Sequence, residues 1–144
     1  SRDRLKMCKD EGNNDEVIRA SCVQLPFKSN CFNSVLFLEL IEHLNLKDQD
    51  KALSETNRIL KSSGRIVITS PNKPIYCLLT KFLHVFEYNP EHIHELSLSE
   101  IKNLVRKYFT ITLVDGKIGG PIDFLDKLCP ALLCWDIVLI GKRS

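Results

Sequence analysis

The fold is decided by residues 35–44, which read Val-Leu-Phe-Leu-Glu-Leu-Ile-Glu-His-Leu. Four apolar residues in succession, Val35 to Leu38, are typical of a strand that is buried on both faces of a sheet. The polar side chains Glu39, Glu42 and His43 follow almost at once. Because sheets of this kind bind ligands at the carboxyl ends of their strands, the stretch predicts a strand that leads directly into a binding site.

The segments around this strand alternate between strand and helix patterns. Residues 48–60 form an amphipathic helix with Leu53, Thr56 and Leu60 in one stripe, and residues 66–68 are a second apolar strand. Further strands are predicted at 16–20, 109–114 and 135–140. Further helices are predicted at 75–85 and from a capping box at 97–100 to about residue 107. A last short helix is predicted after the loop at 116–121 and ends at about residue 128. This alternation predicts a single α/β domain over residues 1–144, with a mostly parallel sheet and helices on both faces.

Composition and charge exclude several classes of function. The formal net charge is only +2, from 20 basic and 18 acidic residues, so we expect no nucleic-acid partner. The most apolar window, residues 122–141, contains three aspartates, a lysine and a proline, and we expect no membrane span. The charged start, Ser1 to Glu11, does not read as a signal peptide. None of the six cysteines forms a C-x-x-C pair, which favours reduced thiols in a cytoplasmic protein.

Three segments, taken in order, resemble class I S-adenosylmethionine-dependent methyltransferases of the small-molecule "type 11" kind. The first is Leu25-Pro26-Phe27 with residues 30–35, similar to the family's turn into its fourth strand. The second is residues 39–44, similar to "E-x-x-E-H-L", followed by a helix and by Gly64 to Asn72, similar to "P-G-G…S-T-P-N". The third is Glu91-His92 with Glu95-Leu96-Ser97, similar to "E-H…E-F-S". Order and spacing together make this resemblance specific.

The resemblance implies a Rossmann-like fold of seven strands and S-adenosyl-L-methionine as the cofactor. The family's Gly-rich turn and ribose-binding carboxylate are missing from residues 1–144, where the one glycine cluster is at 116–120. We therefore expect an N-terminally truncated domain that lacks the first two strands of the family's sheet. Those strands lie between the third and the fourth, so the resemblance also predicts an open sheet edge that could support self-association or accept a partner.

The resemblance also implies roles for individual residues. Ser21, Cys22, Val23, Leu38 and Glu39 are the expected cofactor-binding residues, with Ser21 at a position where the family often has an aspartate that accepts from adenine. Serine is a neutral and therefore weaker acceptor.

Three histidines are candidates for the acceptor side. His43 is the candidate catalytic residue, as a general base, and the alternative is a histidine that only supports the core. His92 and His94 are expected on the substrate side, on one face of an extended segment. Their spacing is not H-E-x-x-H, and we expect no metal site.

The predicted function is methyl transfer from S-adenosyl-L-methionine to a small-molecule acceptor. The alternative is a non-catalytic methyltransferase-like remnant that acts as a protein-binding module through its open edge. An unrelated α/β enzyme is a third reading, but the acidic cluster or Gly-rich phosphate loop that it would need after the first strand is missing from the sequence.

Overall fold

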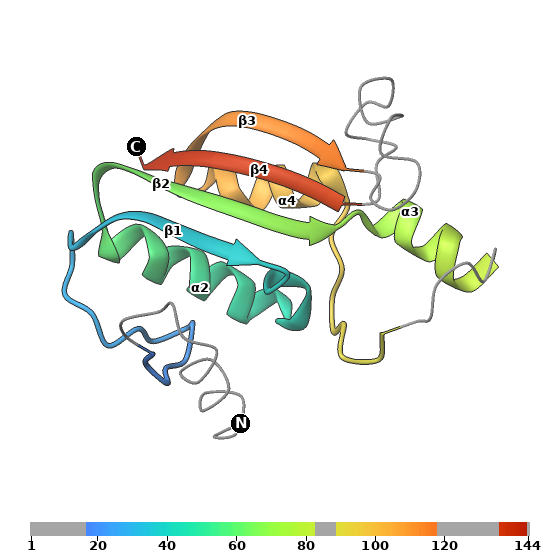
Figure 1. Ribbon diagram of the computed structural model, residues 1–144, viewed down its shortest axis with the longest axis horizontal. Helices are drawn as coiled ribbons and strands as arrows, with labels where there is room; N and C mark the ends of the chain where they lie inside the picture. The colour runs from blue at the N-terminus through green and yellow to red at the C-terminus, as the bar shows by residue number, and fades with distance from the viewer. Residues whose placement is uncertain (1–16, 83–88, 118–135, 144) are drawn as a thin grey trace.

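The computed structural model describes residues 17–82, 89–117 and 136–143. Four strands form one sheet in the order β1-β2-β4-β3. They are β1 (Phe32–Leu38), β2 (Leu60–Pro71), β3 (Phe109–Lys117) and β4 (Asp136–Arg143). The α/β, Rossmann-like class predicted from the sequence is confirmed (Figure 1).

The sheet is mixed in its pairing. β1 pairs with β2 in parallel, with Phe37 opposite Ile68, whereas β4 is antiparallel to both β2 and β3. Three strands therefore share one direction and only β4 runs against them. The sequence predicted a mostly parallel sheet, and these strands do mostly run in one direction, but β4 makes both of its pairings antiparallel. The sequence did not reveal this, because an apolar strand pattern reads the same in either direction.

Two longer helices cover one face of the sheet. These are α2 (Leu46–Ile59) and α4 (Leu98–Arg106). Asn45 begins α2, because its side chain accepts from the backbone N–H of Asp48 at 3.0 Å. A capping box begins α4, as predicted, with Ser97 and Glu100 each accepting from the other's backbone N–H.

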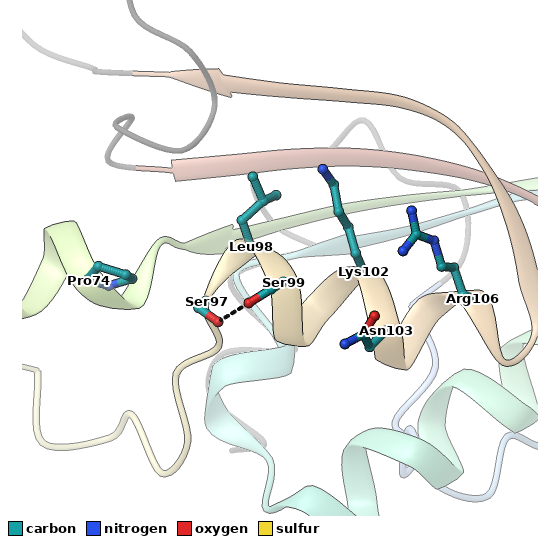
Figure 2. A pocket seen from close by; sticks show the side chains of 7 residues that line it. All are labelled: Pro74, Ser97, Leu98, Ser99, Lys102, Asn103 and Arg106. Atoms are coloured by element: carbon teal, nitrogen blue, oxygen red, sulfur yellow. Dashed lines mark hydrogen bonds between the residues drawn. The ribbon is translucent and has the colours of Figure 1, made fainter.

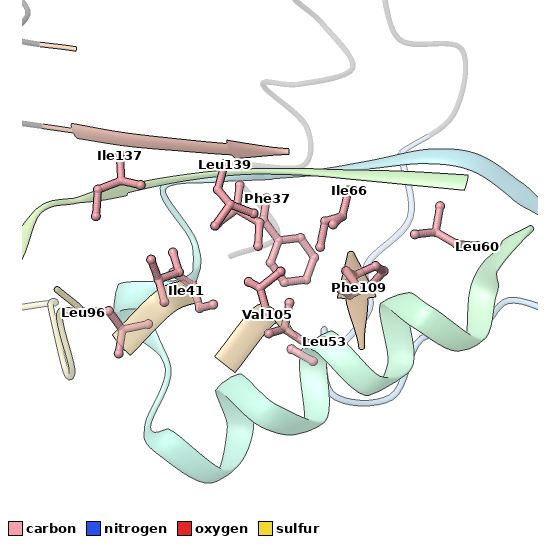
Figure 3. Close-up of a cluster of buried hydrophobic side chains, with 13 residues drawn as sticks. Phe37, Ile41, Leu53, Leu60, Ile66, Leu96, Val105, Phe109, Ile137 and Leu139 are labelled. Carbon is pink, nitrogen blue, oxygen red and sulfur yellow. The ribbon is translucent and has the colours of Figure 1, made fainter. Parts of the chain in front are cut away.

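The core lies between these helices and the sheet (Figure 3). Thirteen buried apolar residues form one cluster, which includes Phe37, Leu53, Ile68, Val105 and Leu139. On the other face Leu36, Leu38 and Leu113 are 60%, 59% and 45% exposed. Within the described ranges, helices therefore cover one face rather than the two that the sequence pattern suggested.

Three short elements connect the sheet. The 3-10 helix η1 (Ile41–His43) follows β1, and α3 (Lys73–Cys77) with the π-helix η2 (Leu78–Phe82) follows β2. The predicted helix at 75–85 thus begins two residues earlier and changes type after Cys77, while residues 83–85 lie outside the described ranges.

Other sequence predictions differ at element boundaries. Residues 17–20 are not a strand, because no described strand lies beside them to supply ladder hydrogen bonds. β2 is much longer than the predicted 66–68, since it also pairs through polar residues at its start. The predicted helix that ends near residue 128, and Trp135 of the last strand, lie outside the described residues.

Close packing explains why residue 64 is a glycine. A Cβ at Gly64 would lie 2.9 Å from the carbonyl oxygen of Lys61 and 3.2 Å from that of Asn33. The turn into the paired part of β2 is therefore too close to β1 for any side chain. Among the described residues no helix has the length and apolar character needed to cross a membrane.

Candidate functional site

The candidate site begins where β1 ends. Glu39 adopts a left-handed backbone conformation, with φ of 47°, which is uncommon for a residue other than glycine. Its backbone N–H donates to the carbonyl and hydroxyl oxygens of Thr69 on β2, at 3.2 and 3.1 Å. This turn redirects the chain into η1 and leaves the Leu38 and Glu39 side chains exposed at the carboxyl end of the sheet. Strained conformations of this kind are often found at functional sites.

Glu42, from η1, is fully buried at this end of the sheet. Its Oε2 accepts from the hydroxyl of Ser70 at 3.3 Å, and its Oε1 has no hydrogen-bond partner. Nε2 of His43 lies 4.0 Å from Oε1. Burial raises the pKa of the Glu42 carboxyl to about 7, because the charged form loses its hydration, and the charge of Glu39 adds to the rise.

The loop before α4 closes over η1 through backbone contacts. The backbone N–H groups of Ile93 and His94 both donate to the Glu42 carbonyl oxygen at 3.0 Å. The amide of Gln49 lies 3.0 Å from the carbonyl oxygens of Ile41 and His94. Gln49 is fully buried in α2 and joins η1 to the loop.

Sequence reasoning missed Gln49. The sequence signal for it was its position, four residues before Leu53 and therefore on the apolar side of the helix. A side-chain amide buried there needs hydrogen-bond partners from other segments.

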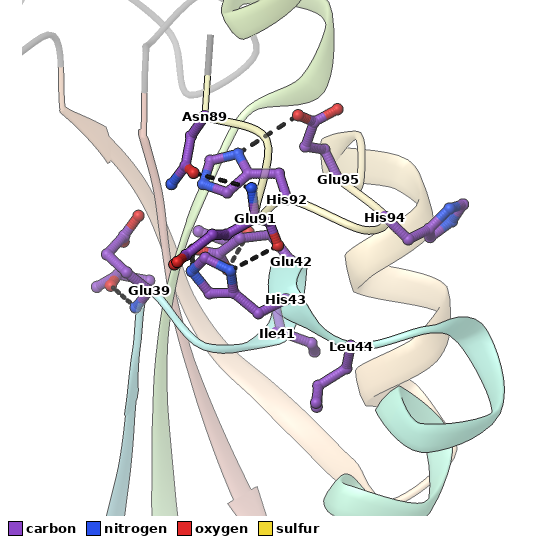
Figure 4. A network of polar contacts seen from close by, with 12 residues as sticks. Glu39, Ile41, Glu42, His43, Leu44, Asn89, Glu91, His92, His94 and Glu95 are labelled. Atoms are coloured by element: carbon purple, nitrogen blue, oxygen red, sulfur yellow. Dashed lines mark hydrogen bonds and ion pairs between the residues drawn. The ribbon is translucent and has the colours of Figure 1, made fainter. Parts of the chain in front are cut away.

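The histidines occupy different environments (Figure 4). His43 places Nδ1 2.9 Å from the carbonyl oxygen of Glu91, and 30% of its side chain is exposed. His92 is only 8% exposed; its ring lies 5.0 Å from that of Tyr76 and 5.1 Å from that of His43. The side chain of His94 points away from this group (Figure 4). The expectation that His92 and His94 share one face is wrong, because residues 90–93 turn and bend instead of extending.

Residues 21–23 belong to a tight turn, in which the backbone N–H of Gln24 donates to the Ser21 carbonyl at 3.1 Å. Ser21 is exposed, while Cys22 and Val23 pack against the core. Burial raises the pKa of the Cys22 thiol, and the charge of Asp48, in the first turn of α2, adds to the rise. The turn therefore lies within electrostatic range of the start of α2.

An ion pair on α2 anchors the segment that follows this turn. Glu55 accepts from the backbone N–H of Leu25 at 3.0 Å, and Arg58 donates to the carbonyl oxygens of Leu25 and Phe27. The two side chains meet at 2.8 Å, and the Arg58 hydrogen bonds hold the pKa of Glu55 at about 2. The sequence signal for this pair was an acid and a base three positions apart on one helix.

A cavity of about 470 Å³ lies elsewhere, along α4 (Figure 2). Its lining combines one proline of α3 with the capping box and two basic side chains: Pro74, Ser97, Leu98, Ser99, Lys102, Asn103 and Arg106. No predicted site residue lines it, so the cavity is separate from the group at the carboxyl end of the sheet.

Comparisons with known proteins give matches among methyltransferases. Residues 1–68 match the family model described as a methyltransferase domain. The ubiquinone/menaquinone biosynthesis C-methyltransferase of Haemophilus ducreyi is 32% identical over 88 residues, which are 61% of this chain and 33% of that protein. The first relatives found are matched over only a quarter to a third of their length.

Solved structures give the same fold. The PH0226 protein of Pyrococcus horikoshii has a TM-score of 0.73 at 17% identity, covering 100% of this chain and 68% of that one. A Thermotoga maritima methyltransferase, described as a possible histamine N-methyltransferase, has a TM-score of 0.68 at 20% identity, covering 90% and 64%. The chain is similar to the class I S-adenosylmethionine-dependent methyltransferases in part of its sequence and in its fold, and S-adenosyl-L-methionine is the cofactor that this similarity implies.

Proposed function

We propose that this protein transfers the methyl group of S-adenosyl-L-methionine to a small-molecule acceptor. The observation that carries the proposal is the strained turn at Glu39, which leaves an apolar side chain and a carboxylate exposed together where β1 ends. The relatives support the acceptor class, since one is named for quinone biosynthesis and another as a possible histamine methyltransferase.

The exposed pair Leu38 and Glu39 fits part of the cofactor. Leu38 is 59% exposed although it is large and apolar, which suits contact with an aromatic or aliphatic part of a ligand. The Glu39 carboxylate can accept from an ammonium group or from hydroxyls. Ser21, with Cys22 and Val23 behind it, is proposed for the adenine amino group, because the hydroxyl is exposed while its neighbours pack inward.

The chemistry asks little of the protein beyond alignment. The cofactor supplies a methyl group on a sulfonium, which is already activated towards an in-line nucleophile. Holding the two reactants in line can contribute roughly 7–11 kcal/mol. A general base is needed only for acceptors with a high pKa.

His43 is the candidate for such a base, since hydrogen bonding of its Nδ1–H to Glu91 would leave Nε2 as the basic nitrogen. His92 and His94, both in the loop before α4, are proposed for the acceptor side.

Titration of S-adenosylhomocysteine into the purified chain tests the proposal. A chain extended upstream of Ser1 is titrated in parallel, because the family's Gly-rich turn and ribose-binding carboxylate are missing from residues 1–144. In whichever chain binds the ligand, we expect Glu39→Gln to weaken binding at least tenfold, because the variant removes the carboxylate and preserves the shape. Leu46→Ala is the matched control, since Leu46 is 62% exposed on α2 and outside the site. Absence of binding by both chains, or binding that Glu39→Gln leaves unchanged, would contradict the proposal.

The open edge of the sheet supports a further element of the proposal, a docking site for another strand. Among the described residues β1 pairs only with β2, and Leu36 and Leu38 are exposed on it. A strand from a second copy or another polypeptide would complete its ladder. Light scattering across a concentration series tests this, and a strictly monomeric chain would exclude self-association.

We also place the protein in the cytoplasm and treat residues 1–144 as one domain. The location is supported by free thiols at the three described cysteines, Cys22, Cys31 and Cys77. The single domain is supported by one core cluster that draws on all four strands. The alternative of a non-catalytic protein-binding module finds no support in the comparisons, and the cofactor titration separates it from the enzyme.

A further inference from the structure

Three side chains from two separate segments meet beside the end of β2. Glu42 and His43 come from η1, and His92 comes from the loop before α4 (Figure 4). Each offers one ligand atom, and these three atoms lie within 4.8 Å of one another. The packing of the loop over η1 thus gathers a carboxylate and two imidazoles that the sequence keeps nearly fifty positions apart.

Glu42 supplies an independent sign that a partner belongs in this group. The side chain is 0% exposed, and its Oε1 has no hydrogen-bond partner. Oε1 faces Nε2 of His43 at 4.0 Å, on the side opposite the Ser70 contact of Oε2. A buried carboxylate oxygen without a partner is costly, and a bound cation would remove that cost.

His43 is oriented as metal-ligating histidines usually are. A ligating histidine normally donates its other ring N–H to a carbonyl or carboxylate, which directs the free nitrogen at the ion. His43 places Nδ1 2.9 Å from the carbonyl oxygen of Glu91. Nδ1 of His92 lies 3.4 Å from a carboxylate oxygen of Glu95, and no hydrogen bond joins the two. In His43 the contact leaves Nε2 as the nitrogen that can ligate, whereas either nitrogen of His92 is available.

We infer that Glu42, His43 and His92 bind a divalent transition-metal ion of the Zn²⁺ type. Two imidazoles and one carboxylate are a ligand set suited to zinc, whereas magnesium and calcium prefer oxygen ligands. Ligand atoms lie about 2.1 Å from a tetrahedral zinc ion, so two of them are about 3.4 Å apart. The Glu42–His43 distance of 4.0 Å and the 4.8 Å limit on the group are longer than this, so the three side chains would have to close in around the ion.

The inference goes beyond methyl transfer and revises two sequence-based readings. The expectation of no metal rested on the spacing of His92 and His94, whereas the ligands come from two segments. An ion on Nε2 of His43 would also exclude that nitrogen as a general base. The metal-binding role and the base role of His43 are therefore mutually exclusive.

Calorimetric titration of Zn²⁺ into the chain, after removal of metal with EDTA and dialysis, tests the site. We expect one ion per chain, with binding at least tenfold weaker in Glu42→Gln and in His92→Gln. His94→Gln is the matched control, because His94 lies two residues further on and points away from the group (Figure 4). Equal weakening by His92→Gln and His94→Gln, or no zinc binding by the wild-type chain, would overturn the inference.

Two readouts keep the result independent of folding and of the cysteines. Circular dichroism without metal establishes that each variant is folded, and Zn²⁺ should raise the Tm of the wild type but not of Glu42→Gln. Glu42→Gln preserves the side-chain shape, so it remains informative if His92→Gln unfolds. The absorption spectrum with Co²⁺ should lack thiolate charge-transfer bands, and their presence would place the ion on cysteines and overturn the assignment.

Discussion

Replacing Glu42 with glutamine should stabilise the protein at alkaline pH and leave it unchanged in mild acid. Burial raises the pKa of this carboxyl from 4.5 to about 7 in the folded state. A difference of that size corresponds to about 3 kcal/mol. The conversion applies here because the side chain is fully buried and not screened by solvent.

The direction of the effect follows from proton binding. Below pH 4.5 the carboxyl is protonated in both the folded and the unfolded state, so it adds no penalty. Between pH 4.5 and about 7 the unfolded chain releases the proton while the folded chain keeps it, and the free energy of unfolding falls as the pH rises. Above pH 7 the folded carboxylate is charged with one oxygen unpaired, and the full loss of about 3 kcal/mol is reached.

Urea unfolding followed by circular dichroism, in buffers with EDTA from pH 4.5 to 8, measures this effect. The quantity of interest is the free energy of unfolding of Glu42→Gln minus that of the wild type, because titrating groups far from Glu42 cancel in the difference. It should rise from near zero at pH 4.5 to about 3 kcal/mol at pH 8.

The control for this experiment is Glu91→Gln, which removes an exposed carboxylate and keeps the backbone carbonyl that meets His43. Its difference from the wild type should stay within about 0.5 kcal/mol at every pH. A difference for Glu42→Gln that is flat with pH would refute the reasoning.

The remaining predictions concern packing and capping, and chemical denaturation measures all of them. Ser97→Ala removes half of the capping box of α4 and should cost about 1 kcal/mol. Leu53→Ala, at a fully buried position, should cost about 2–5 kcal/mol, whereas Leu46→Ala on the same helix, 62% exposed, should change stability by no more than about 0.5 kcal/mol. Gly64→Ala should cost about 1–3 kcal/mol, since its Cβ would lie 2.9 Å from a backbone oxygen. Equal effects at the two leucines, or a neutral Gly64→Ala, would contradict the packing described here.

Elements with strong local signals were predictable. The helix at 46–59 and the helix at 98–106 each contain their own signals, which are a helical spacing of apolar residues and an N-terminal capping residue. The ends of both helices lie within two residues of the predicted ends. The segment at 17–20 has only a short apolar pattern and no described neighbour, and it is not a strand. A strand exists only through its ladder, which is a property of two segments rather than one.

The site was predictable only in part. Glu39, Glu42 and His43 stand together in the sequence after an apolar run, and the structure keeps them together at the carboxyl end of β1. The partners that give them their chemistry come from elsewhere in the chain. Thr69 and Ser70 come from β2, Gln49 from α2, and His92 from the loop before α4.

The sequence by itself therefore determined the α/β class, the positions of the main helices and strands and the resemblance to methyltransferases, because these depend on short-range pattern and on order along the chain. Tertiary structure alone decided the direction of β4, which face of the sheet the described helices cover, and the separation of His92 from His94. It also decided that Glu42 is buried with one oxygen unpaired. Burial and pairing depend on which distant segments pack together, and no local pattern records that choice.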